Sequence, residues 1–229
     1  MNTVRIVSRS SAPFSDRVEA GELLGRELQK FRGQSAVVLG IPRGGVIVAR
    51  EVARALQAEL DIMLSRKLGA PGNPELAIGA ISEDGKLFLN TMLLSRVDAE
   101  SRYIQQEKAR QLAEIERRTA LYRNIRPKVP LEGKLVIVTD DGVATGATMQ
   151  AALWTVRQEG PKKLIAALPV GPEDTVMRLA NDADELICLR SPPLFEAIGQ
   201  FYKRFDQVGD EAVVEILKEE YKMEGRKRT

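Results

Sequence analysis

One segment constrains the fold of this chain more than any other: an apolar strand that runs directly into two carboxylates and a glycine-containing turn. Residues Leu135–Thr139 are continuously apolar or β-branched, which is typical of a strand covered on both faces in a parallel sheet. Asp140 and Asp141 follow directly, and Gly142–Thr148 then leads into a helical pattern. Because ligands in open α/β sheets bind at the carboxyl ends of the strands, this segment predicts a fold class and a site together.

The rest of the chain alternates short apolar runs with segments of helical spacing. Such alternation predicts an α/β fold with a mostly parallel central sheet flanked by helices. The expected strands are residues 35–41, 60–65, 163–170 and 185–190, and the expected helices are residues 46–58, 149–158 and 173–182. The Asp84-Gly85 pair predicts a hairpin of residues 76–82 and 86–90, which follows a breaker-rich loop at residues 69–74.

A long helix is expected from Asp98 to about Arg126, within an insertion at residues 91–126. The apolar residues on one face of this helix are Ile104, Leu112, Ile115 and Tyr122. A solvated surface helix and a helix in a dimer contact both fit this pattern.

The length of 229 residues exceeds the ~150 residues typical of one domain, which favours one elaborated domain. We expect residues 1–229 to form that domain, with its core at about residues 35–190. A small hood would then be formed by the chain ends, residues 1–34 and 191–229.

The absence of histidine and the presence of a single cysteine exclude several kinds of chemistry. The chain cannot supply a Ser-His-Asp triad, a Cys-His pair, His-ligated zinc or haem, or an intrachain disulfide. One cysteine fits a reducing cytosol, and no apolar run approaches the ~18 residues of a membrane span, so we expect a cytoplasmic protein without a membrane partner. The formal net charge of only +2 makes nucleic acid an unexpected partner.

The turn that follows the strand at Leu135–Thr139 has the composition of a phosphate-binding cup. Small residues in Gly142–Thr148 let backbone N–H groups approach a ligand, and the following helix N-terminus carries partial positive charge. Thr145 and Thr148 add hydroxyl donors. Asp140 and Asp141 are suited to accept hydrogen bonds from ligand hydroxyls or to lie near a metal ion. One phosphate beside a vicinal diol describes a ribose 5-phosphate.

At this point the sequence resembles a known family. Val136–Thr148, VIVTDDGVATGAT, is similar to the phosphoribosyl-pyrophosphate (PRPP) binding signature of type I phosphoribosyltransferases, in which two acidic residues precede Thr-Gly-x-Thr. The resemblance covers roughly Ser35–Arg190 and implies the type I phosphoribosyltransferase fold. It implies that Asp140 and Asp141 are catalytic, and that PRPP is bound by Val143, Ala144, Thr145, Gly146, Ala147 and Thr148.

Two further segments are similar to loops of that family. Arg43-Gly44-Gly45 resembles its pyrophosphate loop, where glycines let amides face the diphosphate and the arginine offers charge-assisted hydrogen bonds. Arg66-Lys67 resembles the catalytic pair that opens its mobile loop. Gly69–Ala80, which includes Glu75, would then be the flexible lid that closes over PRPP and excludes water.

In the same family the acceptor is selected by a hood, and Ser191–Gln207 is the matching segment here. Its aromatic residues could stack on a flat base or pack within the hood, and Phe195 and Tyr202 are the candidates for acceptor binding. Ala144 stands where 6-oxopurine enzymes carry a carboxylate, so that base contact is absent. The lid also lacks the second Lys and the His of orotate-type loops. The tripeptide at 144–146 is more similar to adenine phosphoribosyltransferases, without assigning adenine.

The resemblance implies PRPP-dependent phosphoribosyl transfer to a nucleobase or similar small acceptor, with release of pyrophosphate. Mg²⁺ would accompany PRPP, held mainly by the ligand and water with Asp140 and Asp141 nearby. The whole chain is similar to bacterial and archaeal phosphoribosyltransferases of unassigned acceptor, and we expect a homodimer. The alternative is a regulator on this fold that senses PRPP or a nucleotide without turnover and binds nucleic acid. The basic residues in Gly225–Thr229 favour the regulator, whereas Arg66-Lys67 and the lid favour the enzyme.

Overall fold

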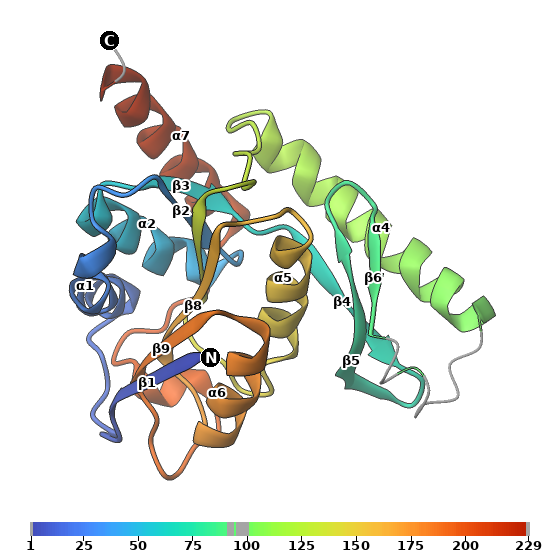
Figure 1. The fold of residues 1–229 in the computed structure, drawn as a ribbon, viewed down its shortest axis with the longest axis horizontal. Helices are drawn as coiled ribbons and strands as arrows, with labels where there is room; N and C mark the ends of the chain where they lie inside the picture. The colour runs from blue at the N-terminus through green and yellow to red at the C-terminus, as the bar shows by residue number, and fades with distance from the viewer. Residues whose placement is uncertain (1, 91–93, 95–100, 228–229) are drawn as a thin grey trace.

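The main sheet has six strands in the order β1-β9-β8-β7-β2-β3, and every pairing in it is parallel (Figure 1). These strands are β1 (Thr3–Ser8), β2 (Ala36–Gly40), β3 (Glu59–Ile62), β7 (Leu135–Thr139), β8 (Lys163–Val170) and β9 (Glu185–Arg190). The computed structural model describes residues 2–90, 94 and 101–227. It confirms the expected α/β fold with a mostly parallel central sheet flanked by helices.

Helices cover both faces of this sheet because its inner strands are apolar on both sides. Alternate residues of β2 point to opposite faces, so Val38 packs with α1 (Arg17–Glu27) and α2 (Gly44–Leu56). Val37 packs on the other face with α5 (Ala147–Arg157) and α6 (Glu173–Leu179). A last helix, α7 (Asp210–Lys227), packs against α2 and β3. In the described part of the chain, no helix combines the length and the hydropathy that crossing a membrane requires.

A second, antiparallel sheet of three strands follows the main sheet: β4 (Ser65–Ala70), β5 (Asn73–Ser82) and β6 (Leu87–Leu89). It lies between α5 and the long helix α4 (Ser101–Arg123) (Figure 1). The turn between β5 and β6 contains Gly85 at φ 76°, which confirms the hairpin expected from the Asp84-Gly85 pair. Only a residue tolerant of positive φ fits that position.

The apolar face predicted for the long helix is covered within the chain. Ile104, Leu112 and Ile115 of α4 pack on the outer face of the small sheet, around Leu68 and Ile78. Tyr122, in the last turn of α4, is part of the main core. Helix α4 therefore fixes the small sheet to the rest of the molecule. Residues 98–100 of the predicted helix lie outside the described residues.

The structure corrects the expected loop at residues 69–74, and it shows that the segment predicted as the lid, Gly69–Ala80, is a strand pair. These residues form the paired strands β4 and β5, joined by a turn at Pro71-Gly72. Small residues allow the close packing that holds them, since Ala77 and Ala80 lie against Ala147 and Ala151 of α5. With α4 covering the other face, residues 69–70 and 77–80 are packed between helices, whereas residues 71–75 at the tip of the strand pair are exposed.

Three features of the secondary structure also differ from the sequence prediction. The strand expected at residues 60–65 ends at Ile62, and Arg66-Lys67 belongs to β4 instead of closing a core strand. Residues 3–8, expected in the hood, form the edge strand β1 beside β9, and the half-buried side chains of Val4 and Ile6 pack against the core on the α5 side of the sheet. Helix α5 begins at Ala147, two residues earlier than expected.

Candidate active site

The acidic turn (Asp140-Asp141) lies directly against the glycine loop (Arg43-Gly44-Gly45). Neighbouring parallel strands bring them together, since Gly40 of β2 pairs with Thr139 of β7 and each loop starts just beyond. A Cβ on Gly44 would lie 2.0 Å from Asp141 Oδ2, and a Cβ on Gly45 would lie 2.7 Å from Asp140 Cα. Only glycine permits this approach, so the two glycines are required by packing at the site. The N-terminus of α2 begins at Gly44 and adds partial positive charge beside the carboxylates.

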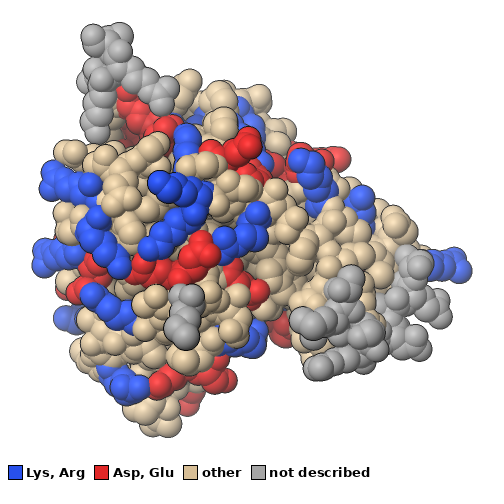
Figure 2. All heavy atoms as spheres, in the orientation of Figure 1, with Lys and Arg blue, Asp and Glu red and all other residues tan. Residues whose placement is uncertain are grey.

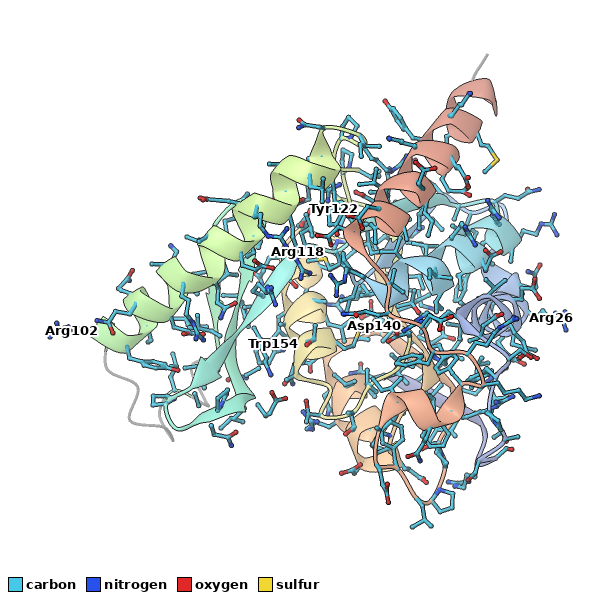
Figure 3. All side chains as sticks on the ribbon, turned by 180° about the vertical axis from the view of Figure 1, so that it is seen from behind. Arg26, Arg102, Arg118, Tyr122, Asp140 and Trp154 are labelled. Carbon is cyan, nitrogen blue, oxygen red and sulfur yellow. The ribbon has the colours of Figure 1, made fainter. Side chains whose placement is uncertain are left out.

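The two carboxylates of the acidic turn have different surroundings. The Asp141 amide donates to Asp140 Oδ1 at 2.8 Å, and Asp141 Oδ2 accepts from Arg17 Nε at 2.8 Å. Burial and the neighbouring Asp141 charge raise the pKa of Asp140 well above its usual value. In Figure 3, Asp140 lies at the centre of the molecule, at the edge of the main sheet. The turn therefore combines one carboxylate fixed by an arginine with one that holds a proton more readily.

Arg17 is a site residue that the sequence analysis did not identify. Its guanidinium carbon lies 3.9 Å from the centre of the Phe205 ring, and Nη1 donates to the Asp206 carbonyl at 2.9 Å. The Phe205 ring also stacks on Tyr202, with 5.1 Å between ring centres. Arg17 occupies the first turn of α1, and no periodic pattern distinguishes it from a surface arginine. Its position follows only from the packing of α1 across the sheet edge.

A cavity of about 380 Å³ lies between the glycine loop and the hood, lined among others by Arg17, Arg43, Asp141 and Phe205. Tyr202 is buried between Phe14 and Phe205, and its hydroxyl donates to the Asp141 carbonyl at 2.6 Å. Burial and the Asp141 charge raise the pKa of this phenol. Tyr202 thus supports the acidic turn instead of presenting an open ring face.

Phe195, the other aromatic candidate, lies 5.0 Å from Phe201 between ring centres and packs against the main core. It is not among the described residues that line the hood cavity. Phe205 is the aromatic residue that borders the space where a ligand would fit, and the sequence analysis did not single it out.

The threonine loop (Ala144–Thr148) forms the turn into α5. Gly146 has a φ of 73°, and a Cβ there would lie 2.8 Å from Thr175 Cγ2. Thr175 Oγ1 in turn donates to the Ala144 carbonyl at 2.9 Å, which anchors the loop on α6. Thr145 and Thr148 are exposed, and the first N–H groups of α5 have no partner inside the helix. The loop therefore offers hydroxyl and amide donors at a helix N-terminus.

Val143 and Ala147 are less available than the other members of the predicted set. The Val143 amide donates to the Val170 carbonyl at 2.9 Å, so it serves the fold. The side chains of both residues are buried, so any contact of Ala147 with a ligand would come from its backbone.

The paired strands β4 and β5 reach the threonine loop through one carboxylate. Lys67 Nζ lies 2.8 Å from Glu75 Oε1, and Glu75 Oε2 accepts from Thr145 Oγ1 at 3.0 Å. The bonds from Lys67 and Thr145 lower the pKa of Glu75. Arg66 donates to Glu114 of α4 at 3.0 Å. Arg66 and Lys67, adjacent in sequence, thus connect the site to α4 and to the threonine loop.

The donor set around the acidic turn fits a cation that a ligand brings with it. Within residues 2–90, 94 and 101–227, no group of three or more Asp, Glu, His or Cys side chains could hold a metal ion. Two adjacent carboxylates remain, each with one oxygen already in a hydrogen bond. A hard cation such as Mg²⁺ would take most of its ligands from phosphate, hydroxyl and water oxygens.

Comparison with known proteins identifies the family. The family model of the phosphoribosyl transferase domain matches residues 17–203. The chain belongs to this family. The match confirms the resemblance carried by Val136–Thr148 and spans the glycine loop, the acidic turn and the threonine loop.

Individual relatives agree with this assignment. The chain is 46% identical over 204 residues to the proteins named "Putative phosphoribosyl transferase Rv0571c" and "Putative phosphoribosyl transferase MT0597" of two Mycobacterium tuberculosis strains, covering 89% of this chain. It spans about half, 46%, of the length of these curated relatives. The crystal structure of TT1426 from Thermus thermophilus is similar with a TM-score of 0.85 and 48% identity, covering 90% of this chain and 98% of that one.

Proposed function

We propose that this phosphoribosyl transferase domain transfers the phosphoribosyl group of PRPP to a nucleobase or similar small acceptor and releases pyrophosphate. The observation that carries the proposal is the direct packing of the glycine loop on the acidic turn, with the threonine loop on the same edge of the sheet. Diphosphate, ribose hydroxyls and 5-phosphate of one PRPP molecule require three such subsites side by side.

Each subsite suits one part of PRPP. Thr145, Thr148 and the backbone amides at the start of α5 would bind the 5-phosphate. Asp140 and Asp141 would accept hydrogen bonds from the ribose hydroxyls, with Arg17 holding Asp141 in place. The glycine loop and Arg66-Lys67 would face the diphosphate, where guanidinium and ammonium groups form charge-assisted hydrogen bonds.

In the proposed reaction the bond between ribose C1 and the diphosphate oxygen breaks, and its electron pair stays on the pyrophosphate. The acceptor nitrogen forms the new bond to C1, and its proton passes to the departing pyrophosphate or to water. Arg43, Arg66 and Lys67 stabilise the charge that grows on the pyrophosphate, and the acidic turn holds the ribose still. Mg²⁺ bound with PRPP would supply further positive charge, and Asp140 and Asp141 are the carboxylates suited to lie beside it. No histidine is needed for these roles.

The acceptor would enter the cavity between the hood and the glycine loop. Arg17 and Tyr202 both pack against the Phe205 ring, so a flat acceptor that stacks on this ring would compete with the arginine. Arg17 and Asp141 also line the space, where the guanidinium can donate hydrogen bonds and the carboxylate can accept them. An acceptor with hydrogen-bonding groups at its edge therefore suits this cavity better than a purely apolar ring.

The test measures pyrophosphate release with PRPP, Mg²⁺ and a panel of purine and pyrimidine bases, beside calorimetric binding of PRPP. Release with at least one base supports the proposal. PRPP binding without release for any base supports the sensing regulator instead, and absence of PRPP binding overturns both. The variant D140N/D141N is the control, because it should lose PRPP binding while it still folds. Its thermal unfolding should stay cooperative but shift to lower temperature, since Arg17 loses its charged partner.

A further inference from the structure

A second cavity, of about 210 Å³, lies between the small sheet and α4. It begins at Pro42, beside the glycine loop, and reaches Thr148 of the threonine loop. Four basic residues and one acidic residue line it: Arg66, Lys67, Arg110, Arg118 and Glu107. Its position and its excess of positive charge both suit an anion that extends from the proposed PRPP site.

Beside this cavity, three guanidinium groups surround one carboxylate oxygen. Glu114 Oε1 accepts from Arg66 at 3.0 Å, from Arg118 at 3.0 Å and from Arg117 at 3.3 Å. These three arginines lower the pKa of Glu114, so its carboxylate stays charged. One negative charge among three positive charges leaves a surplus, and the neighbouring arginines repel each other where they are poorly solvated. Arg66 and Arg118 also line the cavity, so these two could bind a more highly charged anion that displaces Glu114, whereas Arg117 does not line it.

The cluster is tied to the glycine loop through the start of α7. Tyr122 of α4 donates to Asp210 Oδ1 at 2.7 Å, and Arg43 Nη1 lies 3.9 Å from the same oxygen. In Figure 3, Arg118 and Tyr122 lie on the side of α4 turned toward the main sheet, whereas Arg102 lies at the far end of the helix. Arg118 of α4 and Arg43 of the glycine loop therefore both lie near the Tyr122–Asp210 pair.

We propose that α4 contributes Arg118 to the binding of the PRPP diphosphate, and that Glu114 occupies this anion site until the diphosphate replaces it. The proposal rests on the proposed function and extends it to a residue of the inserted helix. Guanidinium groups bind phosphate oxygens through two parallel hydrogen bonds, so Arg118 can exchange a carboxylate for a phosphate without changing its geometry. Arg66, which shares Glu114 with it, would turn to the diphosphate at the same time.

Two neighbouring arginines allow a matched test. Arg118→Gln removes a residue that lines the cavity, whereas Arg117→Gln removes an equal charge from the same Glu114 oxygen. Arg117 is 54% exposed, also contacts Asp210, and does not line the cavity. Calorimetry would compare three ligands for each variant: Mg²⁺-PRPP, inorganic pyrophosphate and ribose 5-phosphate, which lacks the diphosphate.

For R118Q we expect 10- to 100-fold weaker binding of PRPP and pyrophosphate, as for loss of one charge-assisted hydrogen bond. Binding of ribose 5-phosphate should stay within two-fold, and R117Q should bind all three ligands within two-fold of the wild type. Equal losses in R117Q and R118Q, or a loss of ribose 5-phosphate binding in R118Q, would overturn the proposal by indicating a general charge or folding effect.

Glu114→Gln gives an independent readout that a damaged fold would not produce. Glutamine keeps the shape and an acceptor oxygen but removes the competing charge, so pyrophosphate should bind several-fold more tightly. Unchanged or weaker binding in E114Q overturns the displacement step. If the wild type binds PRPP and R118Q binds it equally well, this inference alone is overturned. If the wild type binds neither PRPP nor pyrophosphate, the proposed function is overturned as well.

Discussion

Arg17 and Asp141 lie 124 positions apart in the sequence, and the Arg17 Nε donates to Asp141 Oδ2 at 2.8 Å. Their side chains are only 10% and 14% exposed, so the pair is shielded from solvent. It joins the first helix to the acidic turn and compensates the charge of a carboxylate that adjoins a second one. The position of Asp141 for a ligand therefore depends on a residue from the start of the chain.

Replacing Arg17 by Gln should weaken both folding and binding. Removing one partner of a mostly buried ion pair leaves an uncompensated charge, so we expect the free energy of unfolding to fall by about 3 kcal/mol. PRPP affinity should fall at least ten-fold, because Asp141 loses its fixed orientation. Urea denaturation and calorimetry measure the two effects. Arg26→Gln, an exposed position on the same helix, should change neither, and equal effects at both positions would refute a specific role for Arg17.

The raised pKa of Asp140 predicts a pH-dependent difference between the wild type and Asp140→Asn. The folded protein holds this proton more tightly than the unfolded chain, so the stabilising effect is complete below about pH 4 and is lost as pH rises through the folded pKa. Asparagine resembles the protonated form at every pH. D140N should therefore become more stable than the wild type as pH rises above 4, although it loses PRPP binding. Denaturation curves between pH 4 and 9 that run parallel would contradict this expectation.

Gly44 should not tolerate even a methyl group. A Cβ there would lie 2.0 Å from Asp141 Oδ2, so Gly44→Ala must displace either the glycine loop or the carboxylate. We expect a loss of about 1–3 kcal/mol in unfolding free energy and at least ten-fold weaker PRPP binding. Gly225→Ala is the matched control, since a Cβ there would have no atom within 4 Å apart from its own helical backbone, and alanine favours helix α7. Normal PRPP binding in G44A would show that the contact has no role in the site.

The sequence was informative where local pattern and function coincide. The apolar strand, the two carboxylates and the threonine loop are contiguous, so their order along the chain already places them at one sheet edge. The glycine loop could be placed beside them because parallel strands bring successive loops to the same edge. These arguments need no knowledge of which helix packs where.

Other features depend on packing between distant segments, which periodicity does not encode. Glycines and prolines at residues 69–74 predicted a loop, yet only Pro71-Gly72 form a turn. The residues on both sides of it pair as β4 and β5, whose inner parts are buried by α4 and α5. Arg17 has the pattern of a surface residue and becomes a site residue only through its contact with Asp141. The surface charge does not reveal the position of the site either, since basic and acidic residues are interspersed on the face drawn in Figure 2.

The last prediction concerns Glu75, whose carboxylate accepts a hydrogen bond from Thr145 at 3.0 Å and lies 2.8 Å from Lys67. A 5-phosphate in the threonine loop would have to displace this negative group, so Glu75→Gln should bind ribose 5-phosphate about five-fold more tightly, as for removal of ~1 kcal/mol of repulsion in a solvated site. Glu75 is 60% exposed, so unfolding free energy should change by less than about 1 kcal/mol. Glu173, at the start of α6, forms an ion pair with Arg9. Glu173→Gln removes the same charge there and should leave the affinity for ribose 5-phosphate unchanged. Calorimetry that finds weaker binding in E75Q would instead make Glu75 a positioning residue for the phosphate.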